Sequence, residues 1–359
     1  MKADPVSVVT RLAPESALGI LDVSQVLERV ESRGRIGWVI EGYWPADAYG
    51  VLGAEDKAGK TFALLDLGLS VASGTSWLGH FAVAKGSVLA FLGEGDERAT
   101  MRRLLAIGAD RGVHLADLEG SLRLAFAVPR LSDLEHLAAV ERELSEHPAR
   151  LVIVDPLYLA AAGAKGSDLY AMGELLGGLQ RLAQDAGAAL VVSTHWNKTG
   201  EGSGARRFTG VGPGAWGRVL ASAAVERRTT EPDGTSDVTL RFEFSGSEIA
   251  DQTFRVRRRV RAEDPTDLDS PLHYAVDVTL STPDRDADMP PSRSRVLAAL
   301  GSSDSPLSVR EIGDRLAVDG TGPPLKRTTI QEALEELAEI GLTDAERPGS
   351  GLPNRWWRR

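Results

Sequence analysis

The chain between Trp38 and about Arg261 alternates short apolar runs with longer segments whose apolar residues recur at helical spacing. This alternation is typical of βαβ units around a mainly parallel sheet, so it predicts an α/β fold. The predicted strands are Gly50–Gly53, Ser87–Leu92, Leu122–Phe126, Leu151–Val154 and Ala189–Ser193. The predicted helices between them are Thr61–Ser73, Ala99–Ile107, Leu134–Leu144 and Tyr170–Ala186.

Later strands of the same region have a different pattern, because apolar and polar residues alternate and turn residues such as Pro232–Gly234 separate the runs. That pattern predicts hairpins rather than crossover connections. The runs are Val219–Glu226, Val238–Phe244 and Phe254–Val260.

Changes in composition divide the chain into four parts. Residues 1–36 form an N-terminal segment with one amphipathic pattern, Val23–Val30, and residues 37–261 form the α/β domain. Residues 262–291 are rich in Asp, Pro, Ser and Thr, which predicts a linker. Residues 292–359 then form a domain of their own.

The C-terminal domain has the pattern of three helices followed by a hairpin, which is typical of a small α+β winged-helix domain. Ser308 and Glu311 have the spacing of a capping box at the start of the second helix. The predicted helices are Ser292–Leu300, Ser308–Leu316 and Thr328–Ile340; the hairpin strands are Leu342–Glu346 and Asn354–Trp357, and Pro306–Val309 begins as a short strand.

The segment Ala54–Thr61 fits the P-loop pattern, with Ala54 in place of the first glycine. It follows an apolar strand and opens a helix, which favours this interpretation over a chance Gly-Lys-Thr. Backbone N–H groups at a helix N-terminus bind phosphate, Lys60 neutralises phosphate oxygens, and the Thr61 hydroxyl can ligate Mg²⁺. We therefore predict ATP and Mg²⁺ as cofactors. The predicted nucleotide-binding residues are Ala54, Glu55, Asp56, Lys57, Ala58, Gly59, Lys60, Thr61 and Phe62.

Two other predicted strands end in acids at the edge of the sheet where α/β proteins bind ligands. Asp155 is predicted to hold Mg²⁺ beside Thr61; the alternative is a helix N-cap. Glu94 is predicted to orient and deprotonate the attacking water, with Asp96 and Glu97 as alternatives that could instead serve the first turn of a helix.

The strand Ala189–Ser193 continues into Thr194 and His195, and we predict His195, with Thr194 second, as a polar sensor of the γ-phosphate. The Gly-rich residues that follow predict a long functional loop. Its cations Lys198, Arg206 and Arg207 are candidates for contacting DNA or a neighbouring subunit's nucleotide, the alternative being a solvated loop.

Taken together, the P-loop, the acid after the next strand, the Val-Ile-Val-Asp-Pro run and the His-Trp-Asn-Lys strand tip resemble the RecA-like P-loop ATPases. The similarity is greatest to the RepA/DnaB-like hexameric helicase branch, with its AAA ATPase domain, and covers about residues 37–260. The resemblance implies a RecA-like NTPase core, catalytic roles for Lys60, Glu94, Asp155 and His195, DNA as partner, and a homo-oligomer, with a hexameric ring favoured.

One feature departs from that branch, which usually carries an arginine finger in a stretch corresponding to Val211–Ala215. This stretch contains no arginine, so Arg206, Arg207 or Arg218 are the candidates for that role. The missing arginine argues against processive helicase activity.

In the winged-helix pattern, the start of the third helix and the hairpin are where DNA phosphates and bases are contacted. Duplex DNA is therefore a predicted partner of this domain, and single-stranded DNA of the motor; the alternative for the domain is protein–protein contact. The candidate DNA-binding residues are Lys326, Arg327, Thr329, Arg347 and Arg355.

Composition narrows these interpretations. The 359 residues include 41 Lys and Arg against 51 Asp and Glu, a formal charge of −10, which argues against coating nucleic acid by bulk charge. There is no cysteine, so thiolate metal sites and Cys nucleophiles are excluded. No run approaches the ~18 apolar residues of a membrane span, and we expect a cytoplasmic protein without a membrane partner. An ATP-hydrolysing helicase, an ATP-gated winged-helix regulator and a recombination mediator remain the candidate functions.

Overall fold

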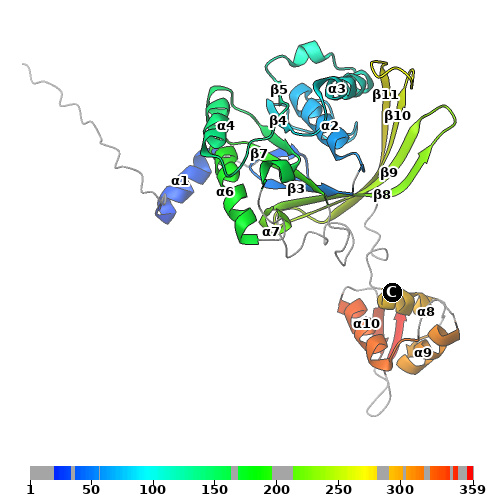
Figure 1. The fold of residues 1–359 in the computed structure, drawn as a ribbon. Helices are drawn as coiled ribbons and strands as arrows, with labels where there is room; N and C mark the ends of the chain where they lie inside the picture. The colour runs from blue at the N-terminus through cyan, green and yellow to red at the C-terminus, as the bar shows by residue number, and fades with distance from the viewer. Residues whose placement is uncertain are drawn as a thin grey trace, which may run out of the picture. The chain divides into compact units, whose positions relative to one another are not determined.

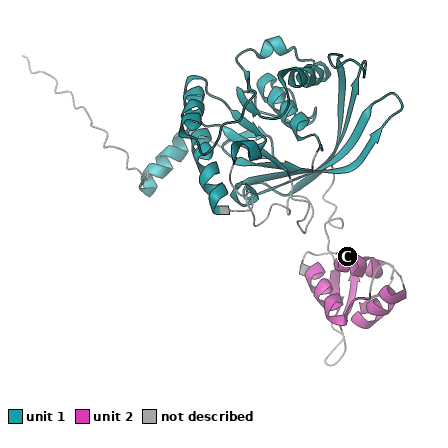
Figure 2. Ribbon diagram, in the orientation of Figure 1, with its two compact units in different colours: residues 1–279 teal, residues 280–359 magenta. Residues whose placement is uncertain are grey.

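The computed structural model divides into two compact units, Met1–Thr279 and Leu280–Arg359 (Figure 2). It describes residues 20–33, 37–55, 57–162, 169–195, 213–280, 291–301, 305–318, 324–339, 343–346 and 354–358.

A nine-stranded sheet in the order β11-β10-β9-β8-β3-β7-β6-β4-β5 forms the centre of the described part of the first unit. Every neighbouring pair of strands from β8 through β3, β7, β6 and β4 to β5 is parallel. On the other side of β8, β9 pairs antiparallel with β8, and β10 pairs antiparallel with β9. The predicted α/β fold with a mainly parallel sheet and a hairpin extension is confirmed. The strands are β3 (Tyr49–Ala54), β4 (Val88–Leu92), β5 (Leu122–Ala125), β6 (Leu151–Asp155), β7 (Ala189–His195), β8 (Val219–Thr230), β9 (Ser236–Gly246), β10 (Gln252–Ala262) and β11 (Leu272–Leu280).

Helices cover both faces of the parallel part of the sheet. α2 (Lys60–Ser73) and α3 (Glu97–Arg111) pack on one face, and α4 (Leu134–Glu146) and α6 (Leu169–Asp185) pack on the other (Figure 1). Because β9 and β10 also pack against α2, this helix is apolar and buried on most sides. The other elements of the unit are α1 (Val23–Arg33), β1 (Trp38–Ile40), β2 (Trp44–Pro45), the 3₁₀ helix η1 (Leu115–Leu118), α5 (Leu157–Ala160) and α7 (Pro213–Trp216).

The prediction of a linker over residues 262–291 was wrong for its central part. Leu272–Leu280 forms β11 beside β10, and Tyr274 is buried against the helix layer of α2. Apolar residues alternate along this strand, but the Asp- and Pro-rich segments on both sides obscured the alternation. The first unit therefore extends to Thr279 rather than ending at Arg261.

The second unit packs three helices on a small antiparallel sheet in the order β12-β14-β13. Its core includes Val296, Ile312, Leu334 and Trp356. The predicted capping box is present, because the Ser308 N–H donates to Glu311 Oε2 at 2.7 Å and the Glu311 N–H donates to Ser308 Oγ at 3.3 Å. The elements are α8 (Pro291–Gly301), β12 (Leu307–Ser308), α9 (Val309–Val318), α10 (Arg327–Glu339), β13 (Thr343–Glu346) and β14 (Arg355–Arg358).

Within the described ranges of both units, no helix combines the length and the apolar character needed to cross a membrane.

Candidate functional site

The P-loop lies between the end of β3 at Ala54 and the start of α2 at Lys60, at the carboxyl edge of the parallel strands. Gly59 has φ +97°, a left-handed conformation that favours glycine at the turn into the helix. The first N–H groups of α2 have no partner within the helix, which makes this end a suitable place for phosphate. Of the predicted nucleotide-binding residues, Asp56 lies outside the described residues.

Lys60 is buried at the helix start, and its Nζ lies 3.5 Å from the carbonyl oxygens of Ala54 and Glu55. The same Nζ lies 3.0 Å from His195 Nδ1 at the tip of β7. Because an ammonium group only donates, this contact requires an unprotonated Nδ1 on His195. The structure thus brings together two residues that are 135 positions apart in the chain.

Asp155, at the end of β6, is 3% exposed and lies directly beside Thr61. The Thr61 hydroxyl donates to Asp155 Oδ2 at 2.8 Å, and the Ser193 hydroxyl donates to Oδ1. A buried carboxylate and a hydroxyl side by side are oxygen donors suited to Mg²⁺, which usually binds one or two protein groups together with phosphates and water. The described residues contain no group of three or more His, Asp or Glu that could hold a metal by themselves, so these donors fit an ion shared with a nucleotide.

Glu94 lies just beyond the end of β4, and Tyr158 on α5 donates a 2.7 Å hydrogen bond to its Oε1. This bond is the main cause that raises the Tyr158 pKa. The competing acid Asp96 instead caps α3, since its carboxylate accepts from the Ala99 N–H. The geometry therefore favours Glu94 over Asp96 as the acid that faces a ligand.

Two of these contacts involve residues that the sequence analysis did not identify, Ser193 and Tyr158. Ser193 precedes a strand tip and could have been found as a polar residue inside an apolar run. Tyr158 lies on the short helix that follows Asp155, and its ring centroid lies 6.2 Å from that of His195. No sequence pattern identified this tyrosine.

Arg218, the one arginine candidate within the described residues, is not brought to this site. Arg218 precedes β8, and its N–H donates to the Tyr49 carbonyl at the beginning of β3, whereas the P-loop follows the end of β3. Its guanidinium pairs with Glu248 at 2.9 Å. Arg218 therefore lies at the amino ends of the parallel strands, whereas the P-loop of its own chain lies at their carboxyl ends. Lys198, Arg206 and Arg207 lie outside the described residues.

Other arginines, from the antiparallel strands, do reach the P-loop. Arg228 on β8 donates to the Lys57 carbonyl at 2.7 Å. Arg258 on β10 approaches the carbonyl oxygens of Ala58 and Gly59 at 3.5 and 3.4 Å. Sequence analysis missed both, although Arg258 stands at an inward position of an alternating strand.

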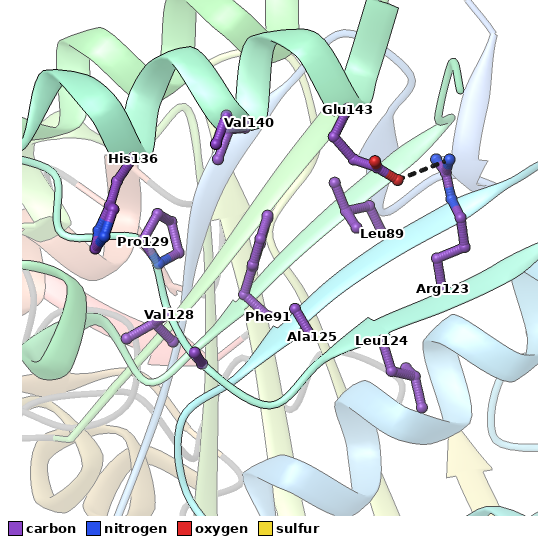
Figure 3. A pocket seen from close by; sticks show the side chains of 12 residues that line it. Leu89, Phe91, Arg123, Leu124, Ala125, Val128, Pro129, His136, Val140 and Glu143 are labelled. Atoms are coloured by element: carbon purple, nitrogen blue, oxygen red, sulfur yellow. Dashed lines mark ion pairs between the residues drawn. The ribbon is translucent and has the colours of Figure 1, made fainter. Parts of the chain in front are cut away.

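A pocket of about 410 Å³ lies elsewhere, between α4 and the strands β4 and β5 (Figure 3). Its lining is mainly apolar, with Leu89, Phe91 and Val140 on its walls and an ion pair of 2.9 Å between Arg123 and Glu143 at one end. None of the predicted phosphate or metal residues line it. The candidate catalytic site is the strand-tip edge rather than this pocket.

In the second unit, Lys326 and Arg327 are exposed at the start of α10, with Thr329 in its first turn. Arg355 on β14 donates to the Pro306 carbonyl at 3.0 Å and lies 3.9 Å from Glu311. Arg347 lies outside the described residues.

Comparison with models of known protein families matches residues 14–201 to an AAA domain. The matched range contains the P-loop and the strands that carry Glu94, Asp155 and His195, and it ends before β8. No curated protein matches the chain.

Proposed function

The chain belongs to the AAA domain family, and from that premise we propose that it is an ATP-hydrolysing, DNA-associated motor related to the RepA/DnaB-like helicases. Family membership supports nucleotide binding and hydrolysis in general. The observation that carries the proposal is the buried Asp155 hydrogen-bonded to Thr61 beside Lys60, at one edge of the sheet. These are the groups that phosphoryl transfer requires at one point.

In this proposal ATP binds with its phosphates at the start of α2, where Lys60 offsets their charge. Thr61 and Asp155 would hold Mg²⁺, which neutralises developing charge on the phosphates. A carboxylate oxygen of Glu94 accepts a proton from the attacking water while the water oxygen bonds to the γ-phosphorus. The bond between the γ-phosphorus and the leaving oxygen of ADP breaks in the same step. Tyr158 holds Oε1 of Glu94, which leaves Oε2 for the water.

We further propose that His195 reports the nucleotide state. Lys60 contacts His195 Nδ1 at 3.0 Å. A γ-phosphate competes for the same ammonium group, because its oxygens carry full charge and imidazole does not. Binding would therefore release His195 from Lys60 and pass the change to the residues that follow β7.

For the second unit we propose a winged helix that contacts duplex DNA through Lys326, Arg327 and Thr329, together with Arg355 on β14 and with Arg347. The order of three helices and a hairpin, together with the exposed cations at the start of α10, supports this. The separate core of this unit also favours a second candidate function, an ATP-gated regulator in which this unit reads DNA.

We propose a homo-oligomer, with a hexameric ring favoured by the resemblance. In support, α1 exposes the apolar residues Val23, Leu27 and Val30, which occupy one face of that helix. An exposed apolar stripe of this kind is typical of a helix that packs against another surface.

The ATPase rate of the full chain, measured alone and with single-stranded or duplex DNA beside a sizing measurement, tests the proposal. Stimulation by single-stranded DNA together with strand separation supports the motor, and slow turnover with sequence-specific duplex binding supports the regulator. Absence of any ATP hydrolysis under all conditions contradicts both.

The double variant Lys326→Ala with Arg327→Ala tests the second unit apart from the motor. If both side chains bind phosphates, the log–log salt dependence of duplex binding should flatten by roughly two units, about 0.9 for each phosphate that is no longer neutralised. Fluorescence anisotropy over a salt series measures this, with basal ATPase as the control. An unaltered affinity and slope would assign the unit to protein contact.

A further inference from the structure

Three arginines from three separate elements form an arginine cluster beside the P-loop and the adjoining Phe62. Arg258 comes from β10, Arg228 from β8 and Arg103 from α3. The guanidinium carbons of Arg258 and Arg103 lie 4.9 and 5.2 Å from the centre of the Phe62 ring. Arg228 and Arg258 bond to main-chain carbonyls of the P-loop.

Arg258 is the buried member of the cluster, with 8% of its surface exposed. The described residues provide its guanidinium with carbonyl oxygens and an aromatic face but with no carboxylate, and its Nε has no hydrogen-bond partner among them. Burial lowers its pKa, and the nearby Arg228 and Arg103 lower it further. A buried cation without an anion is expensive, so this arrangement calls for a negative charge.

Neighbouring arginines on the same strand show that the lack of a carboxylate partner is particular to position 258. Arg257 pairs with Asp237, and Arg259 pairs with Asp277 at 3.1 Å. Those two face outward, whereas Arg258 shares the inward face of β10 with Phe254 and Val256. Within the described residues, the outward arginines of the strand therefore have carboxylates, and the one without a carboxylate is directed at the P-loop.

Gly59 permits this approach. A Cβ added at Gly59 would lie 1.6 Å from Nη1 of Arg258, so any larger residue would displace the guanidinium. The cation thus lies against the residue that immediately precedes Lys60, within the segment proposed to bind phosphate.

We propose that Arg258 is a polyphosphate ligand supplied by the same chain, whose charge is balanced when a nucleotide occupies the P-loop. This rests on the proposed nucleotide binding and goes beyond it, since Arg258 lies outside the family match at residues 14–201. The bound nucleotide would then join the antiparallel extension to the P-loop, and an arginine in cis would supply charge that the stretch Val211–Ala215 does not.

Arg258→Gln in the full chain tests this, because glutamine keeps an N–H donor for the loop carbonyls and removes the charge. ATP and ADP affinities measured by calorimetry should fall about 10- to 100-fold, the scale for losing a hydrogen bond to a charged group. The melting temperature without ligand should stay equal or rise, because an uncompensated buried charge is gone. Arg259→Gln, one residue along and facing outward, is the matched control and should leave affinity unchanged.

Pyrophosphate, which has no nucleoside, tests whether Arg258 contacts the phosphates of the nucleotide rather than its nucleobase. It should raise the melting temperature of the wild type and do so much less for Arg258→Gln. Equal protection of both proteins by pyrophosphate, or a lowered melting temperature of the ligand-free variant with unchanged affinity, would assign Arg258 to holding the loop and overturn the proposal. If the wild type itself binds no ATP, the proposed function fails instead; if it binds ATP and Lys60→Ala removes binding while Arg258→Gln keeps it, only this inference fails.

Discussion

The parallel half of the main sheet and its antiparallel extension bring functional groups to the same place by different routes. In the parallel half, strands β3, β4, β6 and β7 end at one edge, so residues just at or after their ends, such as Glu94, Asp155 and His195, converge. In the extension, Arg258 reaches the P-loop from within a strand because β9 and β10 pack over α2. Strand-tip residues follow from sequence order, whereas the contribution of the extension depends on how the sheet curves over a helix.

The largest expected effect tests the parallel half. Lys60→Ala should abolish hydrolysis and greatly weaken ATP binding, because the phosphates lose the cation at the start of α2. Calorimetry measures the affinity, and a steady-state assay measures turnover. Unchanged ATP affinity would show that the P-loop assignment is wrong and would remove one side of the comparison.

The next effect tests what attaches the extension to α2. Asp66 on α2 is fully buried and accepts from the Tyr274 hydroxyl of β11 at 3.0 Å and from Arg111 at 2.7 Å. Asp66→Asn should lower the free energy of unfolding by up to about 3 kcal/mol, the upper range for losing a hydrogen bond to a charged group. Among the described residues, the buried Arg111 guanidinium would keep only its ion pair with Asp110. Denaturant unfolding of the full chain measures this.

Asp269→Asn is the control for that variant, because Asp269 forms an exposed pair with Arg98. Its effect should stay below about 1 kcal/mol. Equal losses in the two variants would mean that the Asp66 network does not hold the extension in place.

A smaller effect sharpens the comparison at the strand tips. Glu94→Gln should keep ATP binding and cut turnover by ~10² or more, the scale for losing a general base. Asp96→Asn should leave the catalytic step intact, because Asp96 caps α3. Near-normal turnover in Glu94→Gln would move the role of general base to Asp96 or Glu97.

Local pattern was sufficient for most of the fold and for the strand-tip site. The helix and strand predictions rest on periodicity over several residues. The parallel direction of the strands follows from the alternation of strands and helices along the chain. The placement of Thr61 beside Asp155 follows as well, since parallel strands end at a common edge. Among the strands of the nine-stranded sheet, β11 is the exception; it was hidden because its flanks are rich in Asp and Pro.

The sequence by itself determined the α/β core, the P-loop and the acids at the strand ends, because each depends on a short run of residues and on the fixed direction of parallel strands. Only the tertiary structure decided that Tyr158 holds Glu94, that Lys60 contacts His195, and that Arg218 lies at the far edge of the sheet. It also decided that Arg258, 199 residues after Gly59, lies against the P-loop. These contacts join residues distant in the chain through side-chain length, strand curvature and burial, none of which leaves a periodic signal in the sequence.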